Sequence, residues 1–236
     1  MGNVVSPDEM IARFGADSTR MYTLFAAPPD RDLDWQDAGV EGVSRFLSRV
    51  YRLVARHASA KSDSAGKHSL APTARAAQRK LHQTIRRVSI DFEGRWHFNT
   101  SIAAIMELTN ELYLHEKEIA QAGLISDVVR NLVLLLAPFA PYLAHELWAM
   151  IGEESNLLKE PWPKFDAALA KEEEIEIPIQ INGKLRSRLT ISADASEETI
   201  RERALADEKV RIWLDGKQML KPPIVVPGKL VNIVVK

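Results

Sequence analysis

The segment 131–152, NLVLLLAPFAPYLAHELWAMIG, constrains the fold of this chain more than any other stretch. Its apolar run, residues 132–136, is interrupted by Pro138 and Pro141. Proline lacks a backbone donor and clashes with the preceding helical turn, so we predict that one helix kinks or ends at Pro138. Pro141 suits the first position of a second helix, because the missing N–H would be unsatisfied there anyway. The segment therefore predicts buried helical structure with a fixed bend, docked against other helices.

Composition places the chain among soluble globular proteins of one or two domains. It has 236 residues, of which 46% are hydrophobic and 27% charged, with a net charge of −1. Bulk attraction to nucleic acid is therefore excluded, and any RNA contact must come from local basic patches. The absence of cysteine excludes disulfides, a thiol nucleophile and cysteine-ligated zinc, and it fits the cytoplasm. No apolar stretch is long enough to span a bilayer, so we expect no membrane partner.

Five further helices are predicted before the central segment. Helix periodicity and capping signals place four of them at residues 7–14, 17–27, 39–57 and 73–90, followed by a longer one at 100–121 that ends at Gly123. Ser6, Asp17 and Ser126 are the predicted N-caps of the first, second and central helices. Residues 58–72 are small and polar and are predicted to be a connection between helices.

Arginine recurs along two of these helices. Arg45, Arg49 and Arg52, continued by Arg56, are spaced by four, three and four residues, which places them on one face. Arg75, Arg79 and Arg86 share a face of the next helix with His82, and Arg87 lies beside them. Like charges repeated along a helix cost stability unless they are solvated or bind an anion. Both interpretations stay open: solvated faces with ion pairs such as Glu41 to Arg45, or stripes that follow the phosphates of an RNA.

No catalytic or metal site is predicted from the residues. Asp30, Asp32, Asp34 and Asp37 form a carboxylate cluster, but their spacing matches no calcium loop, and solvation or capping explains them better. His97 and His115 have no cysteine, histidine or carboxylate partners at ligand spacing, so both are interpreted as structural.

The hydrophobic period changes to two at Ile175, which indicates a second domain. Ile175, Ile177, Ile179 and Ile181 line one face of a strand, and Asn182-Gly183 marks a hairpin turn. A two-residue turn would place basic residues on the isoleucine face. We therefore predict one extra turn residue, with Gly183 in a bulge and Ile179 opposite Leu185. The outer face would then carry Lys184, Arg186 and Arg188 with Glu176 and Gln180.

Two helices and a second hairpin complete this part. Ser196 is the predicted cap of the first helix, and Val210, Trp213 and Leu214 lie on the second. The stretch IVVPGKLVNIVVK predicts a hairpin with a type II turn at Pro227-Gly228, followed by Lys229. Both of its strands are apolar on both faces except at Asn232, so we predict that both are central. The fold class is thus mainly α: a helical bundle followed by a small α+β domain with two β-hairpins and two helices.

Several stretches resemble class I aminoacyl-tRNA synthetases of the leucyl, valyl, isoleucyl and methionyl subgroup. The stretch LAPFAPYLAHELW is similar to a helix of their anticodon-binding bundle, and GNVV at residues 2–5 is similar to the tail of the KMSKS motif. FEGRWHFNTSIAAIMELTNEL resembles another signature of the bundle, and PPDRDLDWQDAGVEG, with Trp35 as packing anchor, resembles leucyl enzymes. INGKLRSRL and VVPGKLVNIVV resemble the C-terminal domain of bacterial-type leucyl-tRNA synthetases.

This resemblance implies a division of the chain and a role. Residues 1–34 would end the post-KMSKS, stem-contact segment, 35–166 would form the anticodon-binding domain, 167–174 a linker and 175–236 a tRNA-binding domain. The implied partners are tRNA(Leu) and the catalytic core of the same polypeptide, in a protein expected to be monomeric. ATP and Mg²⁺ would serve the parent enzyme, and no cofactor is expected in this part.

The predicted tRNA-binding residues combine the stripes with the small domain. They are Arg45, Arg49, Arg52, Arg75, Arg79, Arg86, Arg87, Lys184, Arg186, Arg188 and Lys229. Two alternatives stay open, namely the same region of a valyl enzyme and a helical scaffold with no RNA role.

Overall fold

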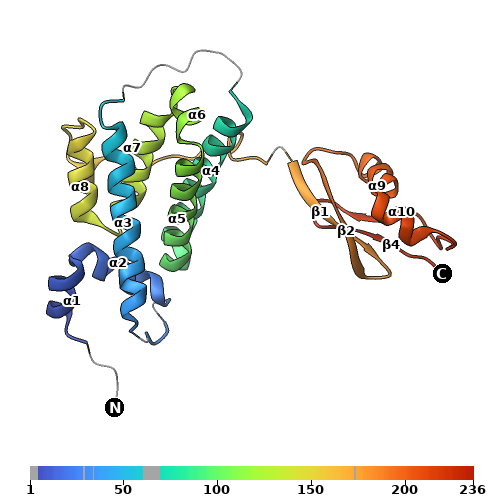
Figure 1. The fold of residues 1–236 in the computed structure, drawn as a ribbon, viewed down its shortest axis with the longest axis horizontal. Coiled ribbons are helices and arrows are strands. Elements are labelled where there is room, and N and C mark those ends of the chain that lie inside the picture. The colour runs from blue at the N-terminus through green and yellow to red at the C-terminus, as the bar shows by residue number, and fades with distance from the viewer. Residues whose placement is uncertain (1–4, 29, 34, 61–69, 173) are drawn as a thin grey trace. The chain divides into compact units, whose positions relative to one another are not determined.

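The computed structural model describes residues 5–28, 30–33, 35–60, 70–172 and 174–236, with no account of the Arg95 side chain. Residues 2–4 of the KMSKS-like tail, Asp34 of the carboxylate cluster and residues 61–69 of the predicted connection lie outside this description. The chain divides into two compact units, Met1–Ala170 and Lys171–Lys236. Figure 1 shows helices in the first and a sheet with two helices in the second. The predicted mainly α fold class is confirmed.

The first unit is a helical bundle. Its longer helices α3, α4, α5 and α7 run side by side in Figure 1, with α8 beside α3 and α7. In chain order the elements are α1 Pro7–Phe14, α2 Ala16–Ala26, α3 Asp37–His57, α4 Pro72–Ile90, a π-helical turn at Asp91–Arg95, α5 Phe98–Leu114, α6 Glu116–Gln121, α7 Ile125–Leu136, α8 Pro141–Met150 and a 3₁₀ turn at Leu157–Lys159.

The core of this bundle is centred on the segment with two prolines. α7 ends at Leu136, whose carbonyl accepts hydrogen bonds from the N–H groups of Phe139 and Ala140 at 2.9 and 3.0 Å. Pro141 then occupies the first turn of α8. Residues 132–136 and Phe139 are all buried. The predicted break at Pro138 is confirmed, and it separates two helices rather than bending one.

Two predicted helix caps are wrong because both residues lie inside a helix and not before it. Asp17 lies inside α2, and its carboxylate accepts hydrogen bonds from the N–H of Leu143 at 2.7 Å and of Tyr142 at 3.4 Å. Asp17 therefore caps α8 rather than its own helix. Leu143, which donates the shorter of these bonds, lies 126 residues further along the chain. Ser126 lies within the first turn of α7, which follows Leu124. Ser6 does precede α1, but its side chain makes no cap hydrogen bond.

The helix predicted at residues 100–121 is interrupted. α5 ends at Leu114, and His115 leaves the helical region at φ −121° before α6 begins. Apolar spacing continues across the break, so periodicity alone could not reveal it. The predicted end at Gly123 is confirmed: this residue has φ +71°, and Leu124 N–H bonds to the carbonyl of Ile119 at 3.1 Å. This is the glycine-terminated helix end in which a left-handed residue closes the last turn.

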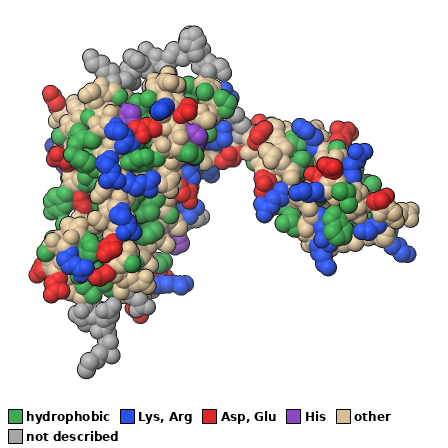
Figure 2. Space-filling view, viewed as in Figure 1, with side chains coloured by type: hydrophobic (Ala, Val, Ile, Leu, Met, Phe, Trp, Pro, Cys, Tyr) green, Lys and Arg blue, Asp and Glu red, His purple; other side chains and the backbone are tan. Residues whose placement is uncertain are grey.

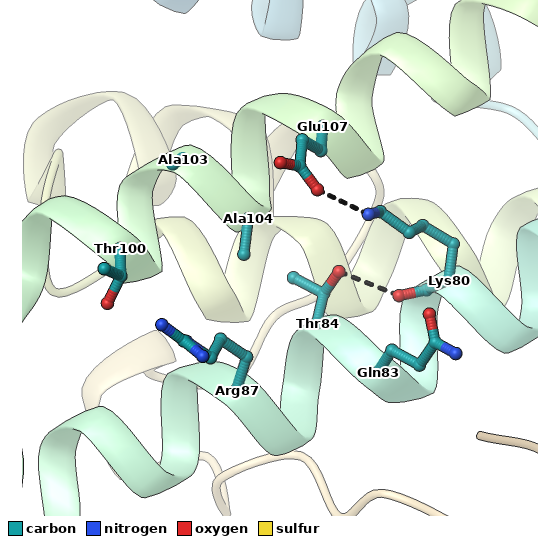
Figure 3. Close-up of a pocket in the computed structure, with 8 residues that line it drawn as sticks. All are labelled: Lys80, Gln83, Thr84, Arg87, Thr100, Ala103, Ala104 and Glu107. Atoms are coloured by element: carbon teal, nitrogen blue, oxygen red, sulfur yellow. Dashed lines mark hydrogen bonds and ion pairs between the residues drawn. The ribbon is translucent and has the colours of Figure 1, made fainter. Parts of the chain in front are cut away.

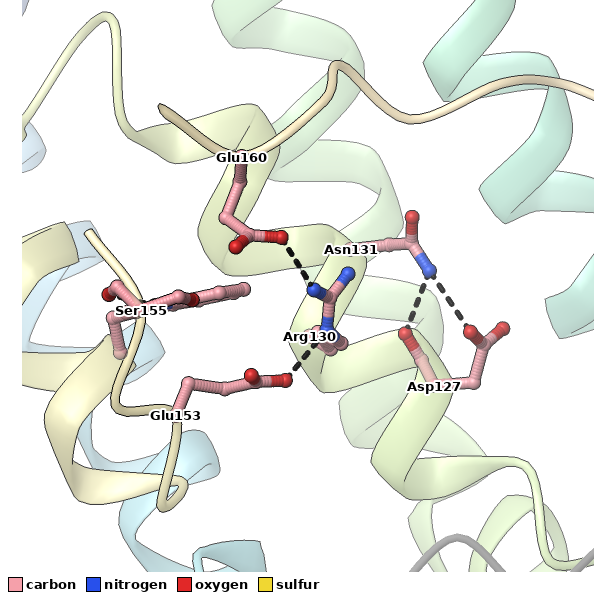
Figure 4. A network of polar contacts seen from close by, with 7 residues as sticks. Asp127, Arg130, Asn131, Glu153, Ser155 and Glu160 are labelled. Carbon is pink, nitrogen blue, oxygen red and sulfur yellow. Dashed lines mark hydrogen bonds and ion pairs between the residues drawn. The ribbon is translucent and has the colours of Figure 1, made fainter. Parts of the chain in front are cut away.

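A polar network ties α7 to the segment after α8 (Figure 4). Arg130 donates from Nε to Glu153 at 2.6 Å and from Nη2 to Glu160 at 2.9 Å. Its guanidinium also lies 4.8 Å from the ring centroid of Trp148. Hydrogen bonds from Ser155 and from Arg130 lower the pKa of Glu160. Because one planar cation bonds two carboxylates, this segment is held against both helices.

The second unit is a four-stranded sheet with two helices. Its elements are β1 Glu174–Ile181, β2 Lys184–Ser192, α9 Glu197–Ala206, α10 Glu208–Leu214, β3 Ile224–Val226 and β4 Leu230–Ile233. The strand order is β2-β1-β4-β3, and β1 pairs with β4 in parallel. The prediction that both strands of the second hairpin are central is right for β4 and wrong for β3. β3 is a three-residue edge strand, in which Ile224 is 40% exposed.

The register predicted for the first hairpin is wrong. Ile181 pairs with Lys184 across a two-residue turn, in which Asn182 has φ +50° and Gly183 φ +76°. The irregularity lies beyond the turn instead, so that Ile179 pairs with Ser187. Asn182 can adopt a positive φ, and its side-chain amide exchanges two hydrogen bonds of 3.0 Å with the backbone of Val235. That contact with the C-terminal segment fixes the tight turn, and β2 accommodates the extra residue.

Candidate nucleic-acid interface

The arginines of α3 differ in how far neighbouring side chains engage them. Arg45 is exposed and lies 3.9 Å from Glu41, which confirms the predicted pair as a loose one. Arg49 donates to the Asn110 side chain at 2.9 Å, and its guanidinium lies 4.8 Å from the ring centroid of Tyr113. Tyr113 in turn donates its hydroxyl hydrogen to the carbonyl of Arg49 at 2.7 Å. Arg45 can therefore reach a ligand freely, whereas Arg49 is already oriented by α5.

The next two arginines of this face, Arg52 and Arg56, differ in whether a carboxylate binds them. Arg52 is exposed and borders a hollow of about 470 Å³ that is lined by α1, α2, α3 and α8. Arg56 makes two hydrogen bonds to Glu116, at 2.8 and 2.7 Å, and His57 shares that carboxylate at 2.8 Å. The hydrogen bond to Glu116 raises the pKa of Arg56, and the same bond lowers the pKa of Glu116. The guanidinium of Arg56 is thus already bonded to a carboxylate of the bundle.

A second hollow, of about 480 Å³, lies beside the first two arginines. Both apolar and polar side chains contribute to it: it is lined by Phe25, Gly39, Gly42, Val43, Arg45, Phe46, Arg49, Met106 and Asn110. Gly39 is required at its edge, because a Cβ atom there would come within 2.4 Å of the Tyr22 ring. Figure 2 shows Lys and Arg side chains gathered along the middle of the face on which α3 lies. This face therefore combines cations with apolar side chains in one hollow.

The arginines of α4 do not form one open stripe. Arg75 donates to the carbonyl of Leu70 at 3.5 Å, and Arg79 is half-buried. Arg86 is exposed, with its guanidinium 6.0 Å from the ring centroid of Phe165. Phe165 belongs to the chain that follows α8, and this chain lies along the same face of α4. Access to the predicted stripe is therefore shared with another segment of the protein.

Arg87 lies on a different side of α4, in a groove against α5 (Figure 3). Its Nε is 3.4 Å from the fully buried carboxylate of Asp91, which also accepts hydrogen bonds from Thr100 and Ser101. Lys80 spans the same groove to Glu107 at 2.5 Å. The groove measures about 390 Å³. Both of its cations are paired with carboxylates.

The basic residues of the second unit do not share one face as predicted. Arg188 pairs with Glu176 at 2.5 Å. The guanidinium of Arg186 instead lies 3.6 Å from the ring centroid of Trp213, which places it towards α10. This follows from the strand irregularity, which turns Arg186 out of the alternation of its neighbours. The side chains of Lys184 and Lys229 are exposed and make no hydrogen bond or ion pair with another described residue.

Aromatic partners are what the sequence-based site prediction missed. Tyr113 lies beside the guanidinium groups of Arg49 and Arg56, at 4.8 and 5.1 Å. Trp213 lies beside Arg186 and also 5.1 Å from Lys217. Cations over aromatic faces are held in place by the ring quadrupole. Neither tyrosine nor tryptophan stands near its arginine in the sequence, so spacing gave no signal for these pairs.

No metal-ligand cluster is present among the described residues: none of them form a group of three or more His, Cys, Asp and Glu side chains suited to a metal. Trp35 packs edge-on against Tyr22 with centroids 4.9 Å apart, and it donates to Asp37 at 2.9 Å. Asp37, one member of the carboxylate cluster, is therefore engaged in a local hydrogen bond. None of the helices in the described ranges has the length and hydrophobicity needed to cross a bilayer.

A helical bundle with exposed arginines, followed by a small sheet domain with exposed lysines, defines a class that the family comparison identifies. Residues 74–201 match the sequence profile of the anticodon-binding domain of tRNA ligases, and the chain belongs to this family. Its relatives are leucine–tRNA ligases. That of Solibacter usitatus is 48% identical over 235 residues, and that of Geobacter sp. strain M21 is 47% identical over 238. These matches cover 100% and 99% of this chain, but only 28% and 29% of the relatives.

A solved structure is similar over nearly the whole chain. It is the ternary complex of Agrobacterium radiobacter K84 agnB2 LeuRS with tRNA and LeuAMS. The TM-score is 0.86 and the identity 36%, covering 99% of this chain and 31% of that one. The similarity therefore includes both units, and this chain spans less than a third of the length of the relatives it matches.

Proposed function

We propose that this chain is the tRNA-binding part of a leucine–tRNA ligase, and that it positions tRNA(Leu) for a catalytic core in the same polypeptide. The observation that carries the proposal is the match of 99% of the chain, at a TM-score of 0.86, to a leucyl enzyme described in a complex with tRNA. The whole protein would attach leucine to tRNA(Leu) with ATP and Mg²⁺ in the cytoplasm, as a monomer. Residues 1–34 would end the post-KMSKS segment, and 167–174 would link the two tRNA-binding domains.

The physical role of such a part is to supply binding energy far from the reacting atoms. Contacts to phosphates fix the register of a nucleic acid without reading its sequence. Holding the body of the tRNA in one place orients its acceptor end, which makes the chemical step effectively intramolecular. The exposed arginines of α3 and the lysines of the second unit are suited to this role, because no buried partner competes for Arg45, Arg52, Lys184 or Lys229.

The test has two arms with the purified chain. The first measures binding of a tRNA(Leu) transcript at several salt concentrations, and binding should weaken as salt rises. The second measures leucine-dependent ATP–pyrophosphate exchange, which should stay at background because this chain has no nucleotide-binding motif of its own. Absence of tRNA binding at low salt would contradict the proposal and favour a helical scaffold. ATP–pyrophosphate exchange above background would contradict the proposal that catalysis belongs to another part of the polypeptide.

A further inference from the structure

The chain after the 3₁₀ turn is attached to α4 by a series of contacts. Residues 161–170, here called the strap, contact α4 at four successive positions. Trp162 donates from its indole to Ser89 Oγ at 2.9 Å, Phe165 lies under Arg86, and Gln83 donates to the carbonyl of Ala170 at 3.0 Å. The first part of the strap, from Trp162 to Phe165, therefore runs antiparallel to α4, and the strap ends where the second unit begins, at Lys171.

His82 makes the fourth contact, and its chemistry differs from the others. The backbone N–H of Asp166 donates to His82 Nδ1 at 3.0 Å. An imidazole nitrogen accepts a hydrogen bond only when it carries no proton, so this contact requires the neutral ring. Asp166 also closes the turn that follows it, because its side chain accepts from Ala168 N at 2.7 Å and its carbonyl accepts from Ala170 N at 2.9 Å. Breaking the His82 bond would thus loosen the end of the strap.

We propose that His82 is a positioning residue: its neutral ring holds the strap on α4 and thereby fixes the point from which the second unit is tethered. With the strap in place, only residues 171–173 separate it from β1. With the strap released, the tether between α4 and the second unit would begin at residue 162 instead of residue 171. The consequence for RNA rests on the tRNA binding proposed above, whereas the latch itself does not.

The charges around His82 give the latch a pH dependence. Burial lowers the pKa of His82 from its ordinary 6.5, against the opposing effect of the carboxylates of Asp166 in the strap and Asp127 on α7. On α4 itself, Arg79 and Arg86 lie about one turn to either side. Because the pKa of His82 is lower in the folded chain than in the unfolded one, the state with the strap docked binds fewer protons than the state with the strap released. The contribution of His82 to docking is therefore fully present above about pH 6.5 and is lost as pH falls through the folded value.

Hydrogen exchange of the strap tests the latch directly. We expect the protection factor of a peptide spanning residues 161–170 to fall between pH 7.5 and pH 5, while protection of α7 stays unchanged. His82→Ala should lower strap protection about five- to tenfold at pH 7.5, as expected for the removal of one hydrogen bond. His82→Asn is the rescue variant, because its amide oxygen can accept the same bond but does not titrate. It should keep wild-type protection at pH 7.5 and lose none at pH 5.

Two exchange outcomes overturn the latch: equal strap protection in wild type at both pH values, or the same loss at low pH in His82→Asn. Gln78→Ala is the matched control on α4, since no hydrogen bond joins the Gln78 side chain to the strap, and it should behave as wild type. Circular dichroism at both pH values verifies that the bundle is folded in each variant.

The positioning role is tested with tRNA(Leu) at constant salt and pH 7.5. The variant His82→Ala/Gln83→Ala/Ser89→Ala removes the three hydrogen bonds between α4 and the strap that are described above, and full release of the strap would lengthen the tether from about three to about twelve residues. Effective concentration falls with about the 3/2 power of tether length, so affinity should fall by up to about eightfold. Unchanged affinity, with strap protection lost, would overturn the positioning role. No tRNA binding by the wild type would instead defeat the proposed function, and the exchange data would still decide the latch.

Discussion

At the scale of single residues, the described arginines divide into those already engaged and those available to a ligand. Arg56 and Arg130 each bond to carboxylates at 2.9 Å or less, and their geometry is that of structural cross-links. Arg45 and Arg52 are exposed and have no such bonds. Arginine suits both tasks, because its planar fork can bond two oxygens at once, whether they belong to carboxylates or to phosphates.

Arg130 should contribute measurably to stability. We expect Arg130→Ala to lower the free energy of unfolding by about 1–2 kcal/mol, because it leaves two charged hydrogen bonds unmade in a partly exposed site. Arg130→Lys should restore little of this, since an ammonium cannot bond Glu153 and Glu160 while stacking on Trp148. Urea denaturation followed by circular dichroism measures both.

Arg45→Ala is the matched control for this cross-link. It also removes an arginine near a carboxylate in the first unit, but the pair is 3.9 Å apart and its arginine side chain is 72% exposed. Its effect should stay below about 0.5 kcal/mol. If Arg130→Ala destabilised no more than Arg45→Ala, the cross-link would have no structural role.

At the scale of elements, the junction of α7 and α8 combines local and distant determinants. Pro138 and Pro141 decide that one helix ends and another begins. Asp17 on α2 then supplies the hydrogen-bond acceptor that the start of α8 lacks. Arg20, one turn further along α2, donates to the carbonyl of Pro138 at 3.3 and 3.1 Å. α2 thus satisfies free backbone groups on both sides of the break.

Removing this cap should destabilise the junction. Asp17→Ala should cost about 1 kcal/mol, as for the removal of other N-caps, because the N–H groups of Tyr142 and Leu143 lose their acceptor. Asp17→Asn should retain most of the stability, since an amide oxygen can accept the same bonds without the charge favoured at a helix start. Thermal or urea unfolding of the three proteins would decide. Equal stability of Asp17→Ala and wild type would show that water replaces the cap fully.

At the scale of the whole molecule, two units with modest local charge patches are expected to act together on one RNA. Neither unit is strongly basic, in keeping with a net charge of −1 for the chain. A few well-placed cations on each unit can still give useful affinity, because linked contacts add through the tether rather than through bulk charge. The slope of log affinity against log salt measures how many phosphates these cations neutralise.

The triple variant Arg45/Arg49/Arg52→Ala tests the face of α3. If all three residues bind phosphates, the slope of log affinity against log salt should become less steep by about 0.7–0.9 for each phosphate that is no longer neutralised. Because Arg49 is engaged with Asn110 and Tyr113, the single variants Arg45→Ala and Arg52→Ala should account for most of the change. Identical slopes for wild type and the triple variant would remove α3 from the interface and leave Lys184 and Lys229 as its main candidates.

Local chemistry allows the sequence to predict a large part of this molecule. The proline break, the helical faces of α3 and α4, the glycine end at Gly123 and the change to strand period at Ile175 all follow from sterics or spacing within a few residues. The position of the turn at Asn182-Gly183 is also visible in the sequence, yet its register is not. The side chain of Asn182 bonds to Val235, which is 53 residues away.

The candidate site shows the same division. Spacing places the arginines on common faces, but it cannot tell which of them another segment engages. Only the folded chain brings Glu116 to Arg56, Trp213 to Arg186, and the strap to His82 and Arg86. Periodicity reports which face of a helix a side chain occupies. The partner it meets there depends on contacts between segments far apart in sequence, and these exist only once hydrophobic burial has packed the helices together.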